Sequence, residues 1–322
     1  MTVGRPRTVF IGTGAFGLEA FRALAISHDI ELVGILTAPA RPAGRDQRLV
    51  PGPIEIAARE AGLGPILSPT RLRDPRAVAE VLDLDPALAV LADYGRIVPA
   101  ALLGLPLRAL NLHPSLLPRH RGAAPIPAAI LEGDRETGVS IIEMDESIDH
   151  GPIVASERLS LTGRETAPEL EADLGARAAD LLVRMLPDWI AGRIEPRPQD
   201  EDRATMTRPL RRDDGRLDPH QSAVTLERQV RAMQPWPGTF LETPLGRLIV
   251  HRATVAPKEA GEGPSYLVAH GGGLALTTSD GRLVLEEVQL AGRRQMNGDE
   301  LRRGQPALVG TAVDLGPPSR VR

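Results

Sequence analysis

The chain has 322 residues, 42% of them hydrophobic and 25% charged, with a formal net charge of −4. This composition is typical of a folded protein of one to three domains and excludes disordered and fibrous chains. No run approaches the ~18 apolar residues of a membrane-spanning helix, and residues 1–7 lack the apolar region of a signal peptide, so we expect a cytoplasmic protein. The absence of cysteine excludes thiolate catalysis and Cys-ligated zinc. The single lysine, Lys258, follows no glycine-rich loop, which excludes a P-loop or Schiff-base lysine.

The first half of the chain alternates short apolar runs with helical patterns. Strands are predicted at residues 8–11, 31–37, 87–92 and in a run that ends at 113, and helices at residues 18–25, 53–62 and 75–83. Strands that are apolar throughout and alternate with helices form a parallel sheet covered on both faces. We therefore expect an α/β fold with an open, doubly wound, mostly parallel sheet of the Rossmann type, which binds its ligands at the carboxyl ends of the strands.

The second half of the chain has a different pattern. Residues 191–208 combine prolines with mixed charge, which predicts an exposed linker between a first domain at 1–190 and a second at 209–322. In the second domain a helix is predicted near 225–233, and short alternating strands are predicted at 247–250, 273–276 and 282–286. Such strands, separated by glycine turns, favour a small antiparallel barrel or sandwich.

A complete GxGxxG motif, Gly12–Gly17, follows the first predicted strand. In this position the motif is typical of a dinucleotide site, provided that an acid ends the second strand and binds the ribose. That strand ends at Thr37 without an acid. We therefore favour a tight turn here and keep an NAD(P)-dependent oxidoreductase as an alternative function.

Polar side chains gather where two later strands end. Asn111 and His113 are two residues apart at a strand end, so they share one face of the sheet. An Asn amide can donate to an oxyanion, and His can move a proton near neutral pH. Residues 139–143 predict the next parallel strand, after which Asp149 would reach the same crevice and orient the imidazole.

The segment from Asn111 to Gly151 resembles the folate-dependent formyltransferases, whose signature is Asn-x-His-x-Ser-Leu-Leu-Pro followed by Asp-x-Gly. Further matching stretches extend the similarity from about residue 7 to about residue 304 and lie at residues 41–45, 94–99, 121–126 and 235–237. The Arg-Pro-Ala-Gly-Arg loop at 41–45 resembles the members that act on methionyl-tRNA.

The resemblance implies a reaction and a catalytic set. A formyl group would pass from 10-formyltetrahydrofolate to the α-amine of methionine on initiator tRNA, without a metal. Asn111 and protonated His113 would stabilise the oxyanion, and Asp149 would assist the proton transfer. Gly12–Gly17 would be a turn that binds no nucleotide.

The resemblance also implies binding residues. The tetrahydrofolate site would be lined by Ser115, Leu116, Leu117 and Pro118. The tRNA phosphates would be bound by Arg41, Arg45 and Arg48, with weaker candidates in the second domain at Arg293, Arg294, Arg302 and Arg303. Arginine suits this role because its planar guanidinium can bond two phosphate oxygens at once. We expect a monomer that needs no membrane.

The resemblance further implies that the second domain is an OB-like β-barrel. Departures from the family pattern and one alternative function accompany the resemblance. The family's Asp-Thr-Gly is Asp149-His150-Gly151 here, with His150 expected to be exposed, and its Thr-Pro after the first strand is Thr13-Gly14. Sugar-nucleotide N-formyltransferases share the catalytic segment and remain an alternative function.

Overall fold

The structure, a computed structural model, describes residues 4–43 and 48–313. It divides into two compact units. The first comprises Met1–Pro125, Glu136–Ser160 and Glu169–Arg208, and the second comprises Ile126–Arg135, Leu161–Pro168 and Pro209–Arg322. Within the described residues, no helix combines the length and the apolar character that crossing a membrane requires.

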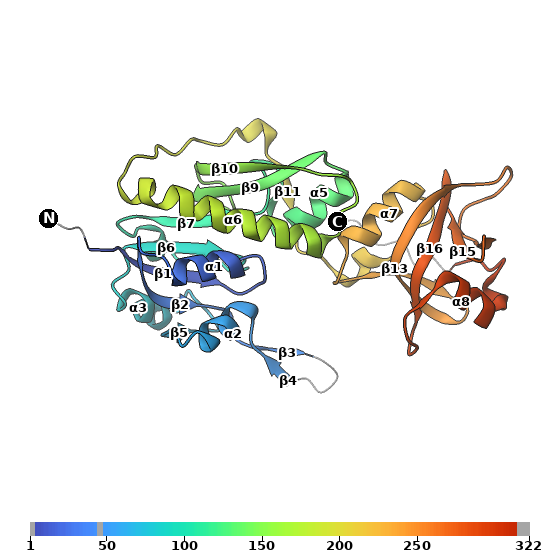
Figure 1. Cartoon of the computed structure of the whole chain (residues 1–322), viewed down its shortest axis with the longest axis horizontal. Coiled ribbons are helices and arrows are strands. Elements are labelled where there is room, and N and C mark those ends of the chain that lie inside the picture. Colours follow the sequence, from blue (N-terminus) through green and yellow to red (C-terminus); the bar gives the residue numbers. More distant parts are fainter. Residues whose placement is uncertain (1–3, 44–47, 314–322) are drawn as a thin grey trace. The chain divides into compact units, whose positions relative to one another are not determined.

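A central sheet organises the first unit (Figure 1). Over the described residues it has seven strands in the order β10-β9-β7-β6-β1-β2-β5. Their bounds are β1 Arg7–Gly12, β2 Glu31–Leu36, β5 Ile66–Leu67, β6 Leu88–Ala92, β7 Ala109–His113, β9 Glu136–Glu143 and β10 Ile153–Ser160. Five neighbouring strands, in the order β5-β2-β1-β6-β7, run parallel to one another. When these five are numbered along the chain, their order in the sheet is 3-2-1-4-5, which is typical of doubly wound folds. The predicted fold class is confirmed.

The direction of β9 differs from the prediction. It runs antiparallel to β7, with His113 opposite Ser140 and Leu110 opposite Glu143. The carboxyl end of β9 therefore lies beside the amino end of β7, and the loop 144–152 folds back for Asp149 to reach β7. The expectation of a parallel strand was wrong because a buried apolar run has the same pattern in either direction.

The three helices predicted in the first half of the chain correspond to α1, α2 and α3, whereas α4, α5 and α6 were not predicted. Their bounds are α1 Leu18–Ala25, α2 Pro53–Glu60, α3 Pro75–Leu82, α4 Ala100–Leu103, α5 Pro125–Glu132 and α6 Ala167–Ile190. Helix α3 shows why these spans form, because Asp74 caps it by accepting from the Arg76 N–H and Pro75 occupies the first helical position. Helices α1 and α6 cross one face of the sheet in Figure 1.

Two short strand pairs accompany the main sheet. β3 (Arg41–Ala43) and β4 (Arg48–Val50) form an antiparallel hairpin that projects away from the sheet in Figure 1. β8 (Arg121–Gly122) pairs in parallel with β11 (Met206–Thr207), which lies within the segment expected to be a linker. The residues of 191–208 are largely exposed as expected, but part of their backbone is hydrogen-bonded to the first unit.

The second unit contains an antiparallel sheet in the order β12-β13-β16-β15-β14, with β17 paired to β16. Its strands and helices are β12 Thr239–Thr243, β13 Gly246–Pro257, β14 Leu267–His270, β15 Gly273–Thr277, β16 Gly281–Leu290, β17 Met296–Asn297, α7 Ala223–Ala232 and α8 Gly298–Gly304. The core contains Leu226 and Val230 of α7 together with Leu248, Leu276 and Leu285 of the sheet. Burying each such side chain contributes about 1.5–3 kcal/mol. The predicted antiparallel second domain is confirmed.

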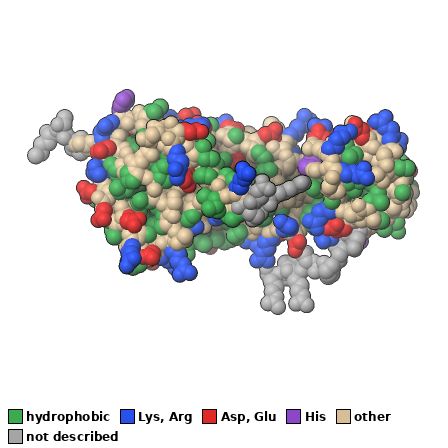
Figure 2. Space-filling model, turned by 90° about the horizontal axis from the view of Figure 1, so that it is seen from below, with side chains coloured by type: hydrophobic (Ala, Val, Ile, Leu, Met, Phe, Trp, Pro, Cys, Tyr) green, Lys and Arg blue, Asp and Glu red, His purple; other side chains and the backbone are tan. Residues whose placement is uncertain are grey.

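Short 3₁₀ turns complete the connections at Glu201–Arg203, Arg212–Gly215 and Pro306–Leu308. Basic and acidic side chains are interspersed on the face drawn in Figure 2. This mixture agrees with the small net charge of −4, and it means that an anion-binding surface has to be sought residue by residue.

Candidate active site

Strand β7 presents Asn111 and His113 on the same face, as their spacing predicts. Asn111 is partly exposed, whereas His113 is only 4% exposed. Both lie toward the carboxyl end of a parallel strand, where a doubly wound sheet binds its ligands.

The carboxylate of Asp149 joins these two residues. Its Oδ1 accepts from Asn111 Nδ2 at 3.0 Å, and its Oδ2 accepts from the Gly122 N–H at 2.8 Å. His113 Nδ1 lies 3.5 Å from the same Oδ2. The structure therefore brings the three predicted catalytic side chains together around one carboxylate.

The ring of His113 faces protein acceptors with both nitrogens. Nε2 lies 2.9 Å from the carbonyl oxygen of His120, while Nδ1 faces Asp149. A neutral imidazole carries one N–H, so only the doubly protonated ring donates at both positions. The geometry therefore offers an acceptor to a ring N–H at either nitrogen.

The loop after β7 is stabilised by hydrogen bonds of the buried Ser115. Ser115 is fully buried, its hydroxyl donates to the Arg119 carbonyl at 2.6 Å, and its own carbonyl accepts from Ser140 Oγ at 2.8 Å. Leu117 is buried as well, whereas Leu116 and Pro118 are partly exposed. Of the four residues expected at a folate site, Leu116 and Pro118 thus offer surface to a ligand, while Ser115 holds the loop in shape.

Several residues around Asp149 were not predicted. The Gly122 N–H, the His120 carbonyl and the side chain of Gln199 all contact the predicted catalytic residues. Gly122 adopts φ +101°, which favours glycine, so a glycine after Arg121 is the one sequence signal that could have pointed to this contact. Gln199 lies in a polar, irregular segment without hydrophobic periodicity, so no sequence pattern predicts its contacts.

His150, which replaces the family's threonine, is exposed as expected. Its Nδ1 forms a hydrogen bond with Asp145 Oδ2 at 2.5 Å, and its Nε2 lies 3.5 Å from Glu201. Glu201 also accepts two hydrogen bonds from Arg121, which lower the pKa of its carboxyl group. His150 therefore contacts two acidic side chains, Asp145 and Glu201, and neither of these interactions involves His113.

Of the first domain's three arginines predicted to bind tRNA, Arg41 and Arg48 lie on the β3–β4 hairpin. Arg41 and Arg48 are exposed on its two strands, and Arg45 lies outside the described residues. In the second unit, Arg294 forms an ion pair with Glu300, and Arg302 donates to the Gly271 carbonyl.

The Gly12–Gly17 loop is closed by Asp93, which follows β6. The N–H groups of Thr13 and Gly14 both point at the Asp93 carbonyl, at 3.1 and 3.4 Å. A Cβ atom added to Gly14 would lie 1.6 Å from Asp93 Oδ2. Backbone N–H groups that would bind a pyrophosphate are thus used within the protein, which disfavours the oxidoreductase alternative.

Asp93 and Glu171 of α6 form a pair of carboxyl groups beside this loop. Burial raises the pKa of Asp93, and burial together with the charge of Asp93 raises the pKa of Glu171. A carboxyl group whose pKa is higher in the folded than in the unfolded chain destabilises the fold once it ionises. The cost begins as pH rises through the unfolded value, close to 3.8 for Asp93, and is complete above the raised folded value.

We therefore expect Asp93→Asn to increase the free energy of unfolding at pH 7, because the amide removes a partly desolvated charge and its repulsion of Glu171. The increase should shrink as pH falls and vanish below about pH 3.8, where the carboxyl is protonated in both states. Urea unfolding of both proteins across this range measures the difference. Asn in place of the exposed Asp29 is the control, with an expected change within about 0.5 kcal/mol. A gain that is independent of pH would contradict this explanation.

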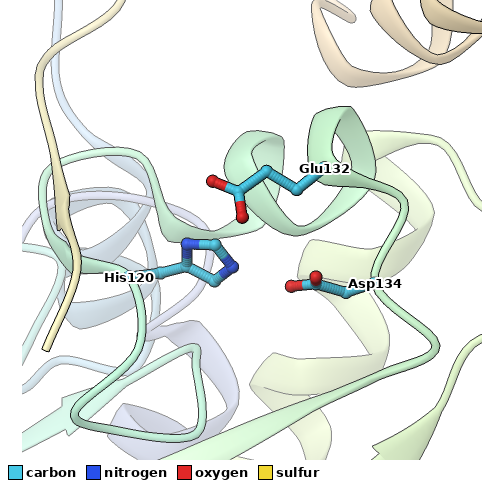
Figure 3. Close-up of side chains that lie close together, drawn as sticks. All are labelled: His120, Glu132 and Asp134. Carbon is cyan, nitrogen blue, oxygen red and sulfur yellow. The ribbon is translucent and has the colours of Figure 1, made fainter. Parts of the chain in front are cut away.

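Among the described residues, one group of side chains has the composition of a metal site (Figure 3). It consists of His120, Glu132 and Asp134, whose candidate ligand atoms lie within 4.8 Å of one another. His120 is buried and Glu132 is exposed. We assign no metal to these residues.

Comparison with known families adds to this geometry. Residues 7–186 match the family model described as formyl transferase, and residues 209–306 match its C-terminal domain. A methionyl-tRNA formyltransferase of Chloroflexus aurantiacus is 44% identical over 297 residues, which cover 91% of this chain and 94% of that protein. One from Myxococcus xanthus is 38% identical over 312 residues, with 96% and 98% covered.

Solved structures show the same fold at lower identity. HypX from Aquifex aeolicus, in complex with tetrahydrofolic acid, is similar with a TM-score of 0.62 and 16% identity over 94% of this chain, which spans only 47% of HypX. WlaRD, a sugar 3N-formyl transferase, has a TM-score of 0.63 and 12% identity, with 87% of this chain and 96% of WlaRD covered. At such identities the likeness extends to the fold alone.

Proposed function

Because the chain belongs to the formyl transferase family, we propose that it transfers a formyl group to methionyl-tRNA and takes that group from 10-formyltetrahydrofolate. Methionyl-tRNA is supported as the formyl acceptor by the similarity to methionyl-tRNA formyltransferases, at 38–44% identity over more than nine-tenths of the chain. The physiological acceptor is methionine on the initiator tRNA.

Asn111 supplies a hydrogen bond to the oxyanion. Its Nδ2 has two hydrogens, and one of them is directed at Asp149 Oδ1. The second hydrogen remains for the oxygen of the formyl group, which becomes negative as the methionine amine attacks the carbon. Because Asp149 orients the amide beforehand, little reorganisation is needed during the reaction.

His113 and Asp149 together stabilise the developing negative charge and assist the proton transfer. The protonated ring adds positive charge near the developing oxyanion, and Asp149 holds that ring in place. A bond forms between the amine nitrogen and the formyl carbon, the bond from that carbon to the folate nitrogen breaks, and one proton passes from the amine to the leaving nitrogen. The His113–Asp149 pair assists this proton transfer.

The loop Ser115–Pro118 borders the folate. Leu116 and Pro118 are partly exposed and would contact its ring system, whereas the buried Ser115 and Leu117 stabilise the loop. An apolar wall of this kind suits the flat ring of a folate, whose polar edge would face backbone groups.

A direct assay separates this function from the sugar-nucleotide alternative. The protein is given 10-formyltetrahydrofolate with a radioactive formyl group, together with either initiator methionyl-tRNA or a nucleotide-linked amino sugar. We expect the label in acid-precipitable tRNA and none on the sugar. Label on the sugar alone would overturn the proposal.

The β3–β4 hairpin should bind tRNA phosphates through Arg41 and Arg48. Changing either residue to Ala should raise the KM for tRNA and reduce the slope of log affinity against log salt by about 0.7–0.9. The KM for 10-formyltetrahydrofolate should stay the same. Filter binding and initial rates at several salt concentrations measure both quantities.

The control for the hairpin is Arg22→Ala on α1, which removes an exposed arginine paired with Glu19 at 2.7 Å. It should change neither the KM for tRNA nor the salt slope. If Arg41→Ala and Arg48→Ala also leave the slope unchanged, the hairpin arginines form an ordinary solvated surface.

A further inference from the structure

The segment 197–207 is bound to the loops that carry the proposed catalytic residues. At one end, Arg197 and Ile153 exchange backbone hydrogen bonds at 2.7 and 2.9 Å. At the other end, β11 pairs with β8, and Thr207 Oγ1 accepts from the Ala124 N–H at 3.0 Å. The segment is therefore held on both sides of Gln199, whose position is set by the backbone.

Gln199 uses its whole amide group. Its Nε2 donates to the carbonyl oxygens of Asp149 and Gly151, both at 2.8 Å, and its Oε1 accepts from Arg121 Nε at 3.1 Å and Nη2 at 2.8 Å. A guanidinium has no acceptor, so Oε1 must face Arg121 and Nε2 must face the two carbonyls. The orientation of the amide is thus determined by its neighbours.

Arg121 is itself immobilised. It is 5% exposed, and besides Gln199 it binds Glu201 through two hydrogen bonds, at 2.9 and 2.6 Å. Charge-assisted, bidentate contacts between a guanidinium and a carboxylate are among the stronger hydrogen bonds in proteins. Gln199 consequently connects a fixed guanidinium to the backbone on both sides of His150.

Asp149 needs such support because of its backbone. Its φ is +49°, in the left-handed region that residues other than glycine rarely adopt. Its carboxylate is held by Asn111 and Gly122, and its carbonyl is held by Gln199. Without the amide of Gln199, the peptide after Asp149 can rotate toward a more common conformation and carry the carboxylate away from His113.

We propose that Gln199 is a positioning residue for formyl transfer, which acts by holding Asp149 in its left-handed conformation. The proposal rests on the proposed function, in which the Asp149 carboxylate takes part in the reaction. It gives the connection after α6 a role in catalysis beyond joining two domains.

The test uses two substitutions in the full-length protein. Gln199→Glu keeps Oε1 toward Arg121 but places an oxygen where Nε2 donated, so both bonds to the carbonyls are lost. Gln199→Met has a similar length, carries no charge and loses the same bonds. Each should lower kcat about 10- to 100-fold, because small displacements of reacting groups are costly, and leave both KM values within about two-fold.

A second measurement distinguishes positioning from general destabilisation. If Gln199 acts through Asp149, Gln199→Met should have no further effect on kcat once Asp149 is Ala, as measured in single turnovers with excess enzyme. A purely structural role predicts the same loss in either background, and that result would overturn the proposal. So would an unchanged kcat in both single variants.

Gln229 on α7 offers a matched control. Its Nε2 also donates to two carbonyls, those of Asp214 at 2.7 Å and Arg216 at 3.0 Å, but in the second unit. Gln229→Met should lower the unfolding midpoint as much as Gln199→Met does and leave kcat unchanged. If Asp149→Ala itself retained full activity, the proposed function of Asp149 would fail, whereas loss with Asp149→Ala and none with Gln199→Met would reject the role of Gln199 alone.

Discussion

Replacing His113 with Ala should lower kcat for formyl transfer by about 100-fold or more, because it removes the group proposed to carry positive charge and move a proton. The ring is 4% exposed and is in contact with Asp149 and the His120 carbonyl, so it offers little surface to the folate in the ground state. The KM for 10-formyltetrahydrofolate should therefore change by less than about threefold. Steady-state rates with initiator methionyl-tRNA measure both constants.

The control for this change is His28→Ala, at an exposed position after α1. It should leave kcat and both KM values unchanged, and circular dichroism should confirm that both variants fold. A kcat for His113→Ala within about threefold of the unmodified protein would remove His113 from the proposed mechanism.

Asp149→Asn should lower kcat by about 10²- to 10⁴-fold, although the side chain keeps its size. Both carboxylate oxygens accept hydrogen bonds, one from Asn111 Nδ2 and one from the Gly122 N–H. An amide has one acceptor oxygen, so its NH₂ group would face a donor at one of the two positions. Asn111 would lose its orientation, and His113 would lose its counter-charge. Single-turnover formyl transfer measures the loss.

Asp145→Asn is the matched control, because Asp145 lies in the same loop and binds the surface residues His150 and Ser147. It should leave kcat within about threefold. Equal losses in the two variants would show that the rigidity of the loop matters, rather than the carboxylate of Asp149.

Local pattern was enough to predict the central strands of both sheets and several of the helices. The apolar runs at 31–37 and 87–92 became β2 and β6, and the strands predicted at 247–250 and 282–286 lie within β13 and β16. Such patterns succeed because a strand covered on both faces is a short apolar run, as in β6, and a strand with one buried face alternates with a period of about two residues, as in β13. Neither pattern depends on the partner strand, which explains the error at 139–143, since the pattern contains no information on the direction of β9.

The sequence by itself determined the α/β class, the antiparallel second domain and the common face of Asn111 and His113, since all three follow from hydrophobic periodicity and the alternation of side chains along a strand. Only the tertiary structure decided that Asp93 closes the Gly12–Gly17 loop and that Gln199 holds Asp149. These contacts join residues far apart in the chain, as Asp149 and Gln199, which are 50 positions apart, illustrate. Polar residues in irregular segments follow no period, so hydrogen bonds of this kind become visible only when the backbone around them is in place.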